Sequence, residues 1–327
     1  MGAGMSSDSG PEGVSGGGGG PTGLGTLPEG CVAEIMLRLE PAEICRLARL
    51  CRTFCGAASA DLVWETKLPR NYRYLLGKAS GDDNSEGRRL TKKEIFALLC
   101  RRNAFGGANM VRACRFPFPF HLHRLALKSP SNCCSDKNIM RISPEFCLEK
   151  KRGLICMWIS SKALSITGIG DRRYWNFIPT AESRFETVAY LHQIWWLEVR
   201  GEVEFCFPEG TYSLYFRLHL GRATKRLGRR VCSPEHVHGW DIKPVRFMLS
   251  TSDGQLAQSK CYLDEPGSWI HYHVGDFVSR SSDTPIGVKF SMTQIDCTHT
   301  KGGLCVDSVL IWPQGFGGLP TASCPLL

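Results

Sequence analysis

The amino-acid sequence predicts an α + β protein of two parts, a small all-α region followed by an antiparallel β-sandwich of the jelly-roll type. Apolar residues recur with a helical period between residues 27 and 68, and with a period of two after residue 153. Turn signals such as Asp253-Gly254 and Pro266-Gly267 separate the alternating runs. Many short strands at this spacing, with little helix among them, favour a sandwich or jelly roll over a barrel.

The first 25 residues differ from everything that follows. Eleven of them are glycine, so residues 1–25 are expected to form a disordered tail. This start lacks the basic residues and the apolar stretch of a secretory signal, and no apolar run reaches the roughly 18–20 residues of a membrane span. We therefore expect the cytoplasm or the nucleus, no membrane association, and sixteen cysteines that are free or buried thiols.

The formal net charge of +9 is a mild excess for this length and does not indicate a specific nucleic-acid partner. The one dense basic run is GRATKRLGRR at residues 221–230. A solvated loop between strands is the simplest interpretation of this run. A nuclear-import patch or a contact with an acidic ligand are the alternatives.

Three short helices are predicted between residues 26 and 69. Two apolar stripes with helical spacing, the second starting after Pro41, precede a shorter one that leads to Trp64. The two stripes comprise Val32, Ile35, Met36 and Leu39, then Ile44, Leu47, Ala48 and Cys51. A unit of about 40 residues buries little apolar surface alone, so it is expected to need a partner surface.

Residues 70–150 are predicted to be a helical and irregular linker. The polar, glycine-containing stretch 71–90 favours a connection without regular structure. Thr91 and Glu94 form the pattern of a capping box, which predicts a helix over residues 91–102. Residues 103–150 show no sustained period and are expected to be irregular.

The β-sandwich is predicted over residues 151–313, with a tail at 314–327. Four alternating apolar runs give the clearest strands, and residues 179–192 are expected to form the one helix inside this region. The runs are centred on Phe216, Phe247, Tyr272 and Phe290.

The sequence lacks the common catalytic motifs, which favours a protein that is not an enzyme and needs no cofactor. The sequence contains no Walker loop, no G-x-S-x-G elbow and no H-E-x-x-H motif. Cys297, His299 and Cys305 are three candidate zinc ligands, but their spacing matches no standard structural site. The histidine pairs 236/238 and 271/273 favour surface or hydrogen-bonded side chains, with a pH-sensitive or metal site as the alternative.

Tryptophan is concentrated in the β region. Trp175 lies in a charged segment, so it is expected to be at least partly exposed or to edge a pocket. Trp195 and Trp196 are neighbours in a strand-like pattern, and because side chains of a strand alternate, one of the two is expected in the core.

The segment LPEGCVAEIMLRLEPAEICRLARLCRTFCGAASADLVW at residues 27–64 resembles an F-box, with Leu27-Pro28 at its start and Trp64 at its end. The resemblance implies docking onto the Skp-type adaptor of a cullin–RING ubiquitin ligase. The side chains expected to present the contact surface are Leu27, Pro28, Ile35, Leu39, Pro41, Ile44 and Leu47.

Residues 151–313 resemble the phloem protein 2 (Nictaba-like) lectins of plants, in segments such as SSKALSITGIGDRRYWNFIP and YLHQIWWLEVRGEVEF. In that family a first loop carries tryptophans that stack on sugar rings. Gly168 stands where the first of these lies, and Trp175 corresponds to the second. The ligand- or target-binding residues that the resemblance implies are Asp171, Arg173, Tyr174 and Trp175.

The two resemblances together imply a substrate-recognition subunit of a Skp–cullin–F-box ubiquitin ligase, with no catalytic step of its own. Its partners would be the adaptor and a protein or glycoprotein target, including one with an N-acetylglucosamine glycan. A cytosolic or nuclear lectin without a ligase role is the alternative. A metalloenzyme that uses the cysteines and histidine named above is a third hypothesis.

Overall fold

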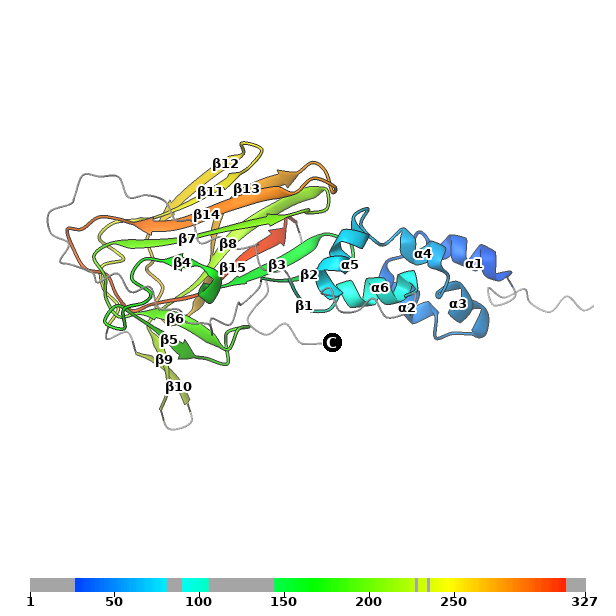
Figure 1. The fold of residues 1–327 in the computed structure, drawn as a ribbon. Coiled ribbons are helices and arrows are strands. Elements are labelled where there is room, and N and C mark those ends of the chain that lie inside the picture. Colours follow the sequence, from blue (N-terminus) through cyan, green and yellow to red (C-terminus); the bar gives the residue numbers. More distant parts are fainter. Residues whose placement is uncertain (1–26, 81–89, 106–143, 227–228, 234–235, 316–327) are drawn as a thin grey trace, which may run out of the picture. The chain divides into compact units, whose positions relative to one another are not determined.

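The computed structural model describes residues 27–80, 90–105, 144–226, 229–233 and 236–315. The predicted tail over residues 1–25 lies outside the described residues, as does the end of the chain from residue 316. The chain divides into two compact units, residues 1–63 and 64–327. The first is helical, and the second consists mostly of antiparallel strands (Figure 1), which confirms the predicted fold class.

The described residues contain six α-helices. Their bounds are α1 Glu29–Met36, α2 Pro41–Leu47, α3 Arg52–Ala57, α4 Asp61–Glu65, α5 Tyr72–Ser80 and α6 Lys92–Leu99. In the first unit, α2 starts with a proline at a position whose N–H has no partner within the helix, so the missing donor costs little. The small core of this unit consists of apolar side chains from α1, α2 and α3, namely Val32, Met36, Ile44, Phe54 and Ala57.

The capping box predicted before α6 is confirmed. The Glu94 amide donates to the Thr91 hydroxyl at 3.3 Å, and the Thr91 amide donates to the Glu94 carboxylate at 2.9 Å. The expectation of a polar connection over residues 71–90 is wrong in its first half, because α5 occupies Tyr72–Ser80. This helix has little apolar surface, and its contacts with the β-domain decide its conformation: Leu75 is fully buried, and the Tyr74 ring lies 5.4 Å from Phe205.

The strands of the second unit form two main sheets and a separate hairpin. Their bounds are β1 Asn103–Ala104, β2 Glu145–Leu148, β3 Ile155–Ser160, β4 Ser165–Ile166, β5 Trp175–Pro179, β6 Thr187–Leu191, β7 Leu197–Phe205, β8 Gly210–Leu220, β9 Arg222–Arg226, β10 Arg229–Ser233, β11 Val245–Thr251, β12 Leu256–Cys261, β13 Trp269–Ser279, β14 Ile286–Gln294 and β15 Leu304–Pro313. A short 3₁₀ turn, Ser161–Ala163, follows β3. The basic run expected to be a loop contributes to the β9–β10 hairpin instead.

Every pairing within the sheets is antiparallel. In the first sheet the order is β1-β2-β3-β15-β6-β5, and β8 pairs with both β15 and β13. In the second sheet the order is β12-β11-β14-β7-β4. Two strands that precede residue 151 thus extend the first sheet, although residues 103–150 show no period in the sequence.

Aromatic side chains fill the space between the two sheets. Phe216 on β8 lies 5.6 Å from Phe247 on β11 and 6.0 Å from Phe290 on β14, measured between ring centroids. Strands β7 and β14 alternate between buried and more exposed residues, as their sequence predicts for strands with one face in a core. The two sheets therefore pack face to face as a sandwich (Figure 1).

The segment around α5, α6 and β1 closes one end of this sandwich. The buried Asn71 amide donates to the carbonyl oxygens of Cys206 at 2.8 Å and Ser282 at 3.0 Å. Phe105 is fully buried, with its ring 5.2 Å from Phe205 and 6.1 Å from Phe146. These contacts tie residues that precede the sandwich in sequence into the same compact unit.

The expected helix over residues 179–192 is wrong. Pro179 ends β5, and residues 187–191 form β6, which pairs with both β5 and β15. The segment contains good helix formers, but Val188, Ala189, Tyr190 and Leu191 are all buried. Burial between two neighbouring strands outweighs a local helix preference of a few tenths of a kcal/mol per residue, roughly.

A buried polar cluster lies on the face of the first sheet that is turned away from the second sheet. The Arg217 guanidinium donates to the Asp307 carboxylate at 2.8 Å and lies 4.2 Å over the Trp269 ring. His271 on β13 is the cross-strand neighbour of Arg217.

No described helix is long and apolar enough to cross a membrane.

Candidate functional site

The loop between β4 and β5, residues 167–174, is held by its own backbone. Asp171 donates its amide to the Gly168 carbonyl at 3.0 Å, and its own carbonyl accepts the amides of Tyr174 and Trp175, each at 3.0 Å. Gly168 has a φ of +77°, in the left-handed region that favours glycine. This conformation folds the charged segment into a tight turn at one end of the sandwich.

Trp175 anchors this loop from inside the domain. Its side chain is 1% exposed, and its indole N–H donates to the Thr167 carbonyl at 3.0 Å across the loop. The expectation that Trp175 is partly exposed is therefore wrong. The charged neighbours in sequence point outward, whereas Trp175 is the first residue of β5 and pairs with the buried Leu191. Its role in ligand binding, implied by the resemblance, stays a prediction.

Asp171, Arg173 and Tyr174 form the outer side of the loop. The Arg173 guanidinium donates to the Asp171 carboxylate through Nε at 3.0 Å and through Nη2 at 2.6 Å. These hydrogen bonds lower the pKa of Asp171, which is therefore charged at neutral pH. The same guanidinium lies 5.6 Å from the centre of the Tyr174 ring. Three of the four predicted residues thus lie together at the surface.

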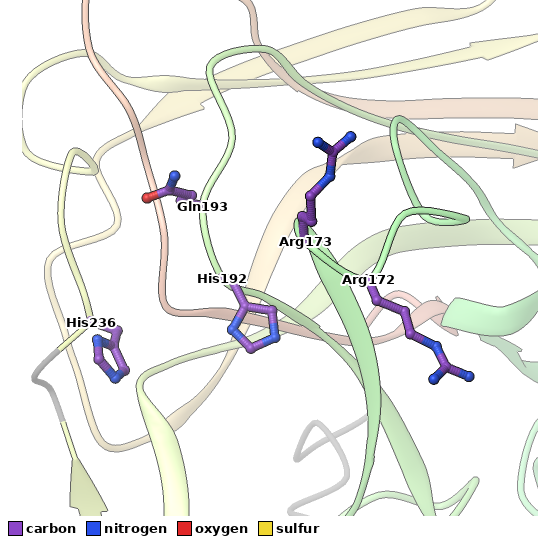
Figure 2. A pocket seen from close by; sticks show the side chains of 5 residues that line it. All are labelled: Arg172, Arg173, His192, Gln193 and His236. Carbon is purple, nitrogen blue, oxygen red and sulfur yellow. The ribbon is translucent and has the colours of Figure 1, made fainter. Parts of the chain in front are cut away.

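An open depression of about 400 Å³ lies beside this loop and is lined by Arg172, Arg173, His192, Gln193 and His236. Figure 2 shows that the guanidinium groups of Arg172 and Arg173 point in different directions. The loop after β6 supplies His192 and Gln193, and the segment after β10 supplies His236. Of these five lining residues, only Arg173 was predicted as a binding residue, and Arg172, His192, Gln193 and His236 were not. Arg172 lies in the predicted loop itself, whereas pairing in space and not a motif brings the other segments together.

His192 connects the two loops. Its backbone amide donates to the Tyr174 carbonyl at 2.8 Å, and its ring Nε2 lies 2.8 Å from the Asn176 side-chain nitrogen. A side-chain carbon on Gly302 would lie 2.2 Å from the His192 carbonyl oxygen, so only glycine permits this close approach. The backbone position of His192, one of the lining residues, is therefore fixed by close packing.

Trp195 and Trp196 are both at the surface, with 52% and 41% of their area exposed. The expectation that one of them is in the core is wrong. Both residues precede β7, which begins at Leu197, so the alternation rule for a strand does not apply to them. Their neighbours Ile194 and Leu197 take the buried positions instead.

A buried lysine holds this tryptophan loop. Lys301 has no exposed area, and its ammonium donates to the carbonyl oxygens of Trp195 at 2.6 Å and Asp296 at 2.8 Å. The ammonium also donates to the Gln294 carbonyl at 3.3 Å, and these three acceptors place the loop of Trp195 beside the loop of Asp296. The adjoining Ile295 is 50% exposed, so an apolar patch of Trp195, Trp196 and Ile295 lies at this end of the sandwich.

The candidate zinc ligands are not brought together. Cys305 is buried in β15, Cys297 is exposed, and the His299 ring lies 3.1 Å from the Gly239 carbonyl oxygen. Among the residues that the structure describes, no group of three or more histidine, cysteine or acidic side chains is arranged to hold a metal ion.

The residues predicted to contact an adaptor differ in exposure within the helical unit. Ile35 is 44% exposed and Pro28 is exposed, whereas Leu27, Leu39 and Leu47 are half-buried. Pro41 and Ile44 are buried, which corrects the expectation that they present the surface. Both lie on the side of α2 that faces the core of the unit, so they support the surface from within.

Two exposed leucines on the same unit were missed by the sequence prediction. Leu50 is 68% exposed and Leu62 is 54% exposed. Leu50 follows α2 and Leu62 lies in α4, and both are outside the two apolar stripes. Neither leucine continues an apolar stripe, so the sequence pattern did not indicate that they are exposed. The exposure of a leucine can be recognised only after the helices are packed.

Family models match both parts of the chain. The F-box-like model matches residues 24–69, and the model for phloem protein 2 matches residues 154–313. The F-box protein PP2-A13 of Arabidopsis thaliana is 54% identical over 289 residues, which is 88% of this chain and 87% of that protein. The F-box proteins PP2-A12 and PP2-A11 of the same plant are 51% and 50% identical, each over 89% of this chain and over 88% and 89% of their own length.

These matches span both compact units in one order, with the helical F-box segment before the β-sandwich. The names of the family indicate an adaptor or a lectin and no catalytic class, in agreement with the lack of catalytic motifs in the sequence. The chain belongs to the plant F-box proteins that carry a phloem protein 2 lectin-like domain.

Proposed function

We propose that this protein is a substrate-recognition subunit of a Skp–cullin–F-box ubiquitin ligase. The observation that carries the proposal is the group of exposed apolar side chains on the small helical unit, Ile35, Leu50 and Leu62. A unit with so small a core that leaves three such side chains exposed has apolar surface available for a protein–protein contact. The F-box-like match over residues 24–69 supports a Skp-type adaptor as the partner at that contact.

The β-sandwich would recruit the target. The segments that contain Arg172, His192 and His236 converge at one end of the sandwich and offer an open depression with polar walls. The adjacent tryptophans add apolar area. Sites that combine a few fixed polar groups with aromatic surface are typical of ligand recognition. The protein or glycoprotein target would bind at this end.

The contribution of such a subunit is proximity. It forms no bond itself, but it holds a target lysine near the ubiquitin-conjugating enzyme and so raises its effective concentration. The proposed compartments are the cytoplasm and the nucleus.

Capture of a purified Skp-type adaptor by the full chain tests this proposal. Glutamate at both Ile35 and Leu50 should weaken capture at least about tenfold, since about 1.4 kcal/mol corresponds to that factor and each buried side chain contributes more. Arg38→Glu together with Ser59→Glu is the matched control, because both positions are exposed in the same unit. Circular dichroism verifies that both variants keep their helices.

A cytosolic or nuclear lectin without a ligase role is the second candidate, and the match of residues 154–313 to phloem protein 2 favours it. The same experiment separates the two. If the native chain captures the adaptor no better than the double glutamate variant does, the ligase proposal is wrong. Calorimetry with chitotriose then measures the lectin activity directly.

A further inference from the structure

We infer that the depression beside the β4–β5 loop binds an extended acidic segment of a partner protein. This inference rests on the proposed function, since it names the class of target that the sandwich would recruit. Its basis is the charge, the direction and the rigidity of the side chains that line the depression.

The lining carries positive charge and no carboxylate. Two arginines, two histidines and a glutamine line it. Asp171, outside the lining, pairs with Arg173 and neutralises part of its charge. Within the described residues Arg172 makes no ion pair, and its side chain is exposed. The full charge of Arg172 and part of the charge of Arg173 are therefore available to a ligand.

The two guanidinium groups diverge in Figure 2, so they do not form a clamp around one small anion. A ligand with several negative charges spaced along a chain can meet each group separately. An extended peptide fits this requirement, because its successive side chains point to opposite sides. Carboxylates can then face the arginines while the intervening apolar side chains face the other way.

The neighbouring apolar patch favours a protein segment. Trp195 and Trp196 follow directly in the loop that supplies His192 and Gln193 to the depression. Exposed tryptophans are frequent at protein contacts because they bury a large area with few rotatable bonds.

A neutral sugar is a poorer match for the same loop. The Trp175 ring is buried, and Gly168 has no side chain to offer as a stacking surface. The half-buried Tyr174 ring has the Arg173 guanidinium above it. Of the two aromatic rings in question, Trp175 thus offers no exposed face to a pyranose ring, and Tyr174 has a guanidinium over one of its faces.

The loop is organised before a ligand arrives. The Trp175 indole, the Asp171 turn and the His192 amide fix the backbone on both sides of Arg172 and Arg173. A fixed backbone reduces the loss of conformational entropy on binding. The fold therefore sets the backbone positions from which the two arginine side chains project.

Fluorescence anisotropy with the full chain tests the inference. The probes are labelled twelve-residue peptides in which Glu alternates with Leu or Phe, and matched peptides with Gln in place of Glu. The Glu peptides should bind at least about tenfold more tightly, and their affinity should fall as salt rises from 50 to 300 mM, since screening weakens exposed charge pairs. Arg172→Glu should reduce the affinity about tenfold.

Arg246→Glu is the matched control, because Arg246 is exposed on β11 and does not line the depression. It should change the affinity less than twofold. The inference would be overturned if the Glu and Gln peptides bound equally or if neither bound. It would also be overturned if Arg172→Glu and Arg246→Glu lost the same affinity, or if chitotriose displaced the peptide. Adaptor capture by Arg172→Glu is measured in parallel. If the native chain captures the adaptor but does not bind the Glu peptides, this inference alone is refuted. If the native chain does not capture the adaptor, the proposed function is refuted.

Discussion

Replacement of Trp175 by alanine should destabilise the β-sandwich. A buried indole removes about 150–250 Å² from water, and at about 25 cal/mol per Å² this corresponds to about 4–6 kcal/mol. Measured losses for buried tryptophan are about 3–5 kcal/mol, because the cavity relaxes in part. The hydrogen bond to the Thr167 carbonyl adds about 1 kcal/mol. We expect a loss of about 4 kcal/mol, a large share of the stability of a domain.

Chemical denaturation of the full chain, followed by circular dichroism in the β region of the spectrum, measures this loss. Trp195→Ala is the control, since that side chain is half exposed and its backbone carbonyl still binds Lys301. It should lower the free energy of unfolding by less than about 1 kcal/mol. Trp175→Phe should lie between the two, because it keeps apolar volume and loses the N–H donor. Equal midpoints for Trp175→Ala and Trp195→Ala would refute the assignment of Trp175 as the structural anchor of the loop.

Two further perturbations test buried polar groups of the same unit. Lys301→Met should lower the free energy of unfolding by about 2–4 kcal/mol in a denaturation experiment, because the carbonyl oxygens that accept from the ammonium lose their donor. Lys289→Met is the control, since Lys289 is exposed. An equal effect of the two substitutions would contradict the role of Lys301. Burial lowers the pKa of His271 from 6.5 to about 4, so between these values the folded protein binds fewer protons than the unfolded chain and loses stability as pH falls. His271→Phe should reduce the fall in melting temperature between pH 6.5 and pH 4. It should not abolish this fall, since burial also lowers the pKa of His219. An unchanged dependence of melting temperature on pH would show that His271 does not titrate in this way.

Local patterns predicted the elements whose signals lie within a few residues. The capping box of Thr91 and Glu94 fixes the start of α6, since both hydrogen bonds close within one turn. The alternating run around Phe290 corresponds to β14, because a strand with one face in a core must alternate. The alternating run around Phe216 also predicted a strand, β8, although polar residues on its other face, such as Arg217, are buried as well. The helix expected over residues 179–192 failed for the complementary reason: its strand β6 gains its stability from β15, more than a hundred residues away.

The candidate site was predicted only in part. The segment of Asp171, Arg173 and Tyr174 is recognisable as a charged loop, and its resemblance to a lectin loop drew attention to it. Nothing in the sequence joins His192 or His236 to this loop. A backbone hydrogen bond to Tyr174 holds His192 beside it, and the segment of His236 is held by a backbone bridge between His238 and the distant Gly302. The exposure of Leu50 likewise depends on how α1, α2 and α3 pack.

By itself, the sequence determined that the chain has a helical part and a β part, where most of the strands lie, and that the two parts resemble an F-box and a phloem lectin. These features depend on hydrophobic periods, caps and turns, which act over a few residues. Only the tertiary structure decided that Trp175 is an anchor and that Trp195 and Trp196 are surface residues. Burial of a side chain is set by the segments that pack against it, and those segments come from distant parts of the chain.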